Sequence, residues 1–70
     1  MLNIGKTIDY LTNIYSDRSK YTDGMILDNM LACYSARKSA LFAGDMDVYE
    51  KNTLELGVLR SVALARMGKE

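Results

Sequence analysis

The sequence predicts an all-α protein: an antiparallel helical hairpin preceded by a shorter N-terminal helix. Three observations support this fold class. Residues 25–43 contain neither glycine nor proline and are rich in Ala, Leu, Met, Arg and Lys, which favour helices. Residues 46–67 again carry apolar residues at helical spacing. Between them, Gly44 suits the left-handed closing position of one helix and Asp45 the N-cap of the next.

Residues 1–21 are predicted to form the first helix. Asn3 is a plausible N-cap, and Ile4, Ile8, Leu11 and Tyr15 recur at intervals of four, three and four residues, which places them on one face. The segment 21–24 is a predicted turn in which Thr22 or Asp23 caps the following helix. The apolar face of the first helix either packs on the hairpin or docks on a partner.

The first hairpin helix, 25–43, has two adjacent apolar stripes. One consists of Leu27, Leu31, Tyr34 and Leu41. The other consists of Ile26, Met30, Cys33 and Ala40, and Arg37 interrupts it. We expect the first stripe to form the seam, meaning the contact with the second hairpin helix.

The second hairpin helix, 46–67, is also apolar on two sides. Its predicted seam residues are Tyr49, Leu56, Leu59, Ala63 and Met67, and a second stripe contains Leu54, Val58, Val62 and Ala65. The short joint forces the helices to run antiparallel. The expected facing pairs are Leu41 with Tyr49, Tyr34 with Leu56, Leu31 with Leu59, and Leu27 with Ala63.

One seam hides one stripe of each helix, so the other stripes need cover from the first helix, from a second copy or from another protein. The predicted partner-binding residues therefore come from the second stripes: Ile26, Met30, Cys33, Leu54, Val58 and Val62.

Composition limits the class of protein. The 70 residues form a single small domain, 1–70, and 49% of them are hydrophobic, which argues against disorder. Nine acidic and nine basic residues cancel, so no net charge recruits nucleic acid or an anionic membrane. No apolar run is long enough to span a bilayer, and the start lacks a signal-peptide pattern. The single free cysteine suits a reducing cytoplasm.

No catalytic signature is present. The chain has no histidine, which excludes Ser-His-Asp and Cys-His arrangements, and a single cysteine without histidine excludes the usual zinc sites. The glycines are isolated and form no phosphate-binding loop. Asp45 and Asp47 lie where acidic residues cap a helix, and Cys33 fits a small buried apolar position. We expect no enzymatic activity, no cofactor and no metal.

A family resemblance covers residues 26–65. The run Ala43-Gly44-Asp45, then Tyr49, then Leu59 followed by Arg60-Ser61-Val62-Ala63-Leu64-Ala65, resembles the small E-type co-chaperones of the type III secretion needle protein. The resemblance implies a non-enzymatic protein of the bacterial cytoplasm. Such a protein lays its hairpin against a larger helical-repeat chaperone, and the pair keeps the needle subunit soluble.

Three other functions remain open. In the first, the chain is a small phage or bacterial regulator that inhibits a kinase or a repressor. In the second, it is a coiled-coil-like homo-oligomer that covers its own apolar surface by self-association. A DNA-binding accessory protein would need clustered basic residues on a recognition helix, and Arg37-Lys38 is the only adjacent basic pair.

Overall fold

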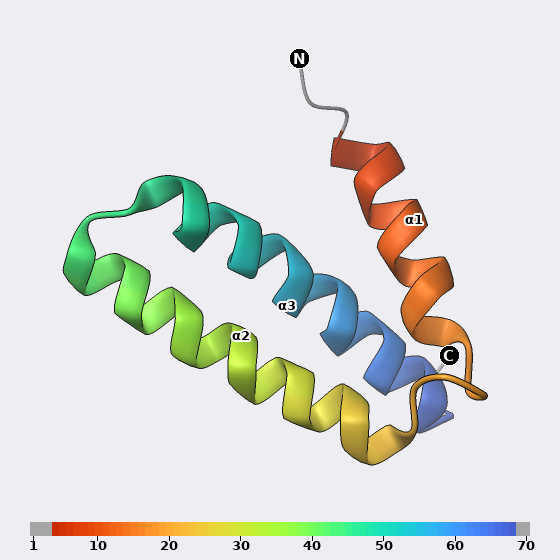
Figure 1. Cartoon of the computed structure of the whole chain (residues 1–70). Coiled ribbons are helices and arrows are strands. Elements are labelled where there is room, and N and C mark those ends of the chain that lie inside the picture. Colours follow the sequence, from red (N-terminus) through yellow and green to blue (C-terminus); the bar gives the residue numbers. More distant parts are fainter. Residues whose placement is uncertain (1–3, 69–70) are drawn as a thin grey trace.

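The computed structural model describes residues 4–68, which form three helices: α1 (Ile4–Ser16), α2 (Asp23–Ala43) and α3 (Met46–Arg66). Helices α2 and α3 lie side by side as an antiparallel hairpin, and α1 packs against α3 (Figure 1). The predicted all-α hairpin with a shorter N-terminal helix is therefore confirmed. The predicted cap Asn3 lies outside the described residues.

Helix α1 ends at Ser16, five residues before the predicted boundary at Tyr21. The reason is local: the Asp17 carboxylate accepts hydrogen bonds from the backbone N–H and the hydroxyl of Ser19, which stabilises a turn instead of another helical turn. These bonds lower the pKa of Asp17. The chain reverses in this turn and enters α2 at Asp23.

The ends of the hairpin helices are set by the predicted caps. The Thr22 hydroxyl accepts a hydrogen bond from the Met25 N–H at 3.2 Å, so α2 begins at Asp23, two residues earlier than expected. Gly44 closes α2 with a φ of 74°, the left-handed conformation that favours glycine. Asp45 then caps α3, because its carboxylate accepts the Val48 N–H at 3.2 Å.

The core lies where the three helices meet. Its buried residues are Ile26, Cys33, Val58, Leu59 and Val62. Leu11 and Tyr15 of α1, together with Tyr21 of the turn, pack against this cluster. The rings of Tyr15 and Tyr21 meet edge to face, with centroids 5.0 Å apart, so the end of α1 and the turn cover the core as one unit.

Arg66 joins the carboxyl end of α3 to the turn between α1 and α2. Its guanidinium donates to the backbone carbonyl of Tyr15 at 2.8 Å, to that of Tyr21 at 2.6 Å, and to the Asp23 carboxylate at 3.1 Å. Its side chain is only 6% exposed. Two carbonyls that no helix satisfies are thus hydrogen-bonded, and the stretch from Tyr15 to Asp23 is held to the distant end of α3.

Candidate protein-interaction surface

The predicted partner-binding residues lie mainly inside the molecule. Ile26, Cys33, Val58 and Val62 are buried, and Met30 and Leu54 are half-buried. On α3, Val58 and Val62 of the second stripe lie in the cluster that α1 covers, which is the first of the alternatives considered for that helix, whereas Ala65 is exposed. On α2, the second stripe packs on α3 and forms the seam. These residues stabilise the fold, and the expectation that they form a free surface is wrong.

The exposed apolar surface is instead the α2 stripe that was expected to form the seam. We call it the α2 face, and it consists of Leu27, Leu31, Tyr34, Leu41 and Phe42. These side chains are between 56% and 81% exposed. Isolated exposed apolar side chains are common, but five share one side of this helix, with Lys38 among those nearest its carboxyl end. A gathering of this size is typical of an interaction site.

Three shallow apolar hollows lie in a row beside the α2 face, and neighbouring hollows share Leu27 or Tyr34, so together they form a groove. Its opposite wall consists of α3 residues and the residue that caps α3, and no α1 residue lines it: Tyr49, Leu56, Ala63, Arg66 and Met67. Tyr34 and Leu56 line the same part of the groove, as do Leu27 and Ala63, and Leu41 and Tyr49. The members of each pair therefore lie at the same level of the hairpin, but they border a surface groove and do not form the buried seam that was predicted. The pair Leu31 with Leu59 is not formed in this way, because Leu59 is fully buried and Leu31 is exposed.

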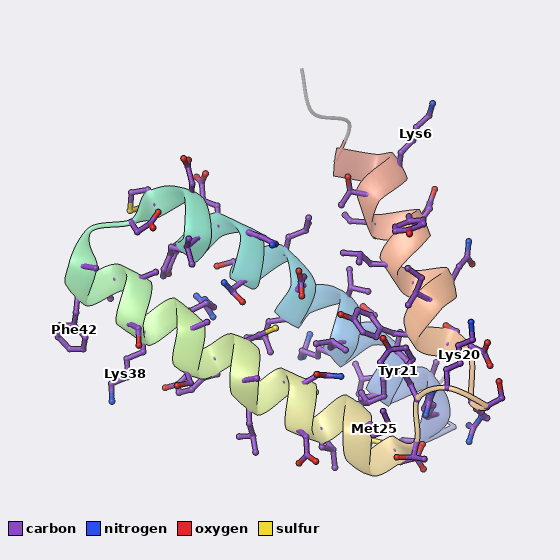
Figure 2. The ribbon with its side chains drawn as sticks, viewed as in Figure 1. Lys6, Lys20, Tyr21, Met25, Lys38 and Phe42 are labelled. Carbon is purple, nitrogen blue, oxygen red and sulfur yellow. The ribbon has the colours of Figure 1, made fainter. Side chains whose placement is uncertain are left out.

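Arg37 fixes the hairpin near its tip. Its guanidinium donates to the Tyr49 hydroxyl at 3.0 Å and lies 4.9 Å from the centre of the same ring. The residue that interrupts the buried stripe of α2 thus contributes a hydrogen bond and a cation–π contact between α2 and α3. Lys38 and Phe42, by contrast, extend outward from this half of α2, away from α3 (Figure 2).

The half-buried Glu55 carboxylate lies between α1 and α2. The Cys33 thiol donates a weak hydrogen bond to Glu55 Oε2 at 3.9 Å. Burial, with the adjacent Glu55 charge, raises the pKa of Cys33 above that of a free thiol, and the same two causes raise the pKa of Tyr15 above that of a free phenol. A buried thiol that resists ionisation is a poor nucleophile, so Cys33 acts as a core residue.

These pKa shifts predict a loss of stability at alkaline pH. Below about pH 7.5 both groups are protonated in the folded and unfolded chains, and they contribute no pH dependence. As the pH rises, the unfolded chain ionises first, so it binds fewer protons than the folded chain and becomes favoured. We expect the free energy of unfolding to fall between neutral pH and about pH 10.5, measured by urea denaturation.

Two variants separate the contributions to this pH dependence. Cys33→Ala removes the thiol, and Tyr15→Phe removes the phenol while keeping the ring. Each is expected to make the alkaline decline shallower than in the wild type. If the decline in each variant were as steep as in the wild type, neither group would be responsible for it.

Comparisons with known proteins leave the chain without an assigned family, since no family model, curated protein or solved structure matches it. Among residues 4–68, no group of three His, Cys, Asp or Glu side chains lies close enough to hold a metal ion. None of the three described helices is both long and apolar enough to cross a membrane.

Proposed function

We propose that this chain is a non-enzymatic protein-interaction protein whose α2 face binds a helical surface of another protein. The single observation that carries this proposal is the exposure of five large apolar side chains along one helix. Burying such a side chain completely contributes about 1.5–3 kcal/mol, so covering even part of the α2 face favours association. A rigid helix that presents residues at this spacing fits the helix-in-groove mode of recognition.

The proposed partner is a helical-repeat chaperone, and the proposed role is that of a co-chaperone for a type III secretion needle subunit in the bacterial cytoplasm. This class follows from the resemblance of residues 26–65, and the capped Gly44-Asp45 joint between two long antiparallel helices supports it. The contact residues differ from those first expected, because Ile26, Val58 and Val62 are buried. The α2 face takes their place.

Site-specific photo-crosslinking tests the proposal. A photoreactive phenylalanine derivative at Tyr34 is introduced in the organism that encodes the chain, with the same substitution at Tyr10 of α1 as the control. The two tyrosines are 61% and 66% exposed, so they sample solvent to a similar degree. We expect Tyr34, and not Tyr10, to give a discrete crosslinked product with a helical-repeat protein, identified by mass spectrometry.

Leu31→Asp, which puts a charge into the centre of the α2 face, is expected to abolish that product while the far-ultraviolet circular dichroism of the chain stays unchanged. A product with a kinase or a repressor would instead assign the chain to the regulator class. Identical products from Tyr34 and Tyr10, or no heterologous product from either, would refute the binding of another protein through the α2 face.

A further inference from the structure

The charges beside the α2 face are arranged symmetrically about the middle of the helix. Helix α2 runs from Asp23 to Ala43, so Cys33 is its midpoint. Asp28 lies five residues before Cys33, and Lys38 lies five residues after it. At about 1.5 Å per residue, the two charges lie at equal distances from the midpoint and on opposite sides of it.

Neither charge has an ion-pair partner among residues 4–68. Asp28 and Lys38 are both exposed, and among residues 4–68 the ion pairs of Asp23 with Arg18 and Arg66 involve neither of them. Lys38 extends into solvent from the outer side of α2 (Figure 2). Lys38 lies among the α2 face residues Tyr34, Leu41 and Phe42, and Asp28 follows Leu27. Two unpaired opposite charges at such positions can pair between the two copies of a self-complementary interface.

We propose that two copies of this chain associate through their α2 faces in an antiparallel arrangement. The two-fold axis lies between the two α2 helices, level with Cys33 along each helix, and places Asp28 of each copy beside Lys38 of the other. In this register the two α2 helices overlap along their whole length. A parallel arrangement would instead place Asp28 against Asp28, and a shift by one helical turn, about 5.4 Å, would separate the charges.

The apolar residues agree with the same register. Gly24 and Phe42 each lie nine residues from Cys33, so Phe42 of one copy faces Gly24 of the other. Phe42 is the most exposed large apolar side chain of α2, and the position of a Cβ on Gly24 would be open apart from the Thr22 hydroxyl at 3.9 Å. The glycine thus leaves flat backbone on which an aromatic ring of the second copy can lie. Leu31 and Tyr34 pack near the axis.

This dimer uses the α2 face of the proposed function but does not depend on any heterologous partner. Both occupants would cover the same side chains, so the dimer and the heterologous complex exclude each other. The homodimer is then the form in which the apolar face stays protected from water until the other protein displaces the second copy.

Sedimentation equilibrium of charge-reversal variants at low ionic strength tests the register. We expect the wild type to be dimeric in the micromolar range. Asp28→Lys and Lys38→Asp should each weaken the dimer about tenfold or more, because the two-fold axis turns one substitution into two like-charge contacts. An equimolar mixture of the two variants should restore dimerisation, and so should the double variant D28K/K38D. Asp9→Lys and Lys20→Asp are exposed controls that change the net charge equally and should have no effect.

A wild-type monomer would overturn the proposal, as would a dimer that Asp28→Lys and Lys38→Asp leave unchanged or that the mixture fails to restore. The two proposals fail separately. If the wild type is monomeric but Tyr34 still crosslinks to a heterologous protein, only the dimer is wrong. If the charge variants behave as expected but Tyr34 gives only a product of twice the monomer mass, the heterologous function is wrong.

Discussion

Replacing Val58 by aspartate is expected to abolish the folded state. Val58 is 3% exposed and lies in the core with Leu59 and Val62, beneath the cover of α1. An unpaired carboxylate at this position costs several kcal/mol, which is comparable to the roughly 5 kcal/mol of stability that a small domain has. Circular dichroism should show a largely unfolded chain at neutral pH without denaturant.

Val48→Asp is the matched control for this substitution. Val48 is the same residue type on the same helix, but it is 39% exposed and lies in the first turn of α3, where the helix dipole favours a negative charge. We expect its urea midpoint to equal or slightly exceed that of the wild type. If Val58→Asp unfolded no more readily than Val48→Asp, the Val58 side chain would have to face water. Val58 would then be accessible to a partner, as the sequence predicted.

The boundaries and register of the hairpin were predictable because short-range chemistry determines them. The left-handed conformation of Gly44 ends α2 whatever surrounds it, and the Asp45 carboxylate caps α3 from within its own first turn. Once the joint is fixed, antiparallel geometry places Tyr34 beside Leu56 and Leu27 beside Ala63, as expected.

The rotation of α2 about its own axis was not predictable in the same way. Its two apolar stripes differ by one residue, or about 100° around the helix, and both contain enough apolar residues to form a seam. The structure buries the stripe with the smaller side chains Cys33 and Ala40. Arg37, which interrupts that stripe in the sequence, donates a hydrogen bond to the Tyr49 hydroxyl across the seam.

The rotation decides the location of the candidate site. Because the stripe with Ile26 is buried, the larger side chains Leu31 and Tyr34 remain outside. The cover of Val58 and Val62 by α1 depends on contacts between residues far apart in sequence, including the Arg66 bonds to Tyr15 and Tyr21. Periodicity within one helix carries no information about such contacts. The sequence therefore predicted as buried the stripe of α2 that is exposed in the structure, and as exposed the stripe that is buried.

Arg66→Met is expected to lower the free energy of unfolding by about 3 kcal/mol. The substitution keeps an unbranched apolar stem but removes the donors that serve the carbonyls of Tyr15 and Tyr21 and the carboxylate of Asp23. The two carbonyls then lose their partners in a part-buried site, where an unmet hydrogen bond costs about 1–3 kcal/mol. Urea denaturation followed by circular dichroism measures the loss.

Two controls show which of these contacts matters. Arg60→Met makes the same change at an exposed position of α3 and should cost little. Asp23→Asn leaves the carbonyl contacts of Arg66 in place and removes the ion pairs of Asp23 with Arg66 and Arg18. Since the Asp23 side chain is 71% exposed, the loss should be below about 1 kcal/mol. The carbonyl contacts would then carry most of the effect, because a guanidinium is rigid and forked and reaches both carbonyls at once.

Arg66→Lys keeps the charge but not the forked guanidinium. Its free energy of unfolding should consequently fall between those of the wild type and Arg66→Met. An Arg66→Lys variant as stable as the wild type would mean that charge alone holds α1 and the turn on the hairpin.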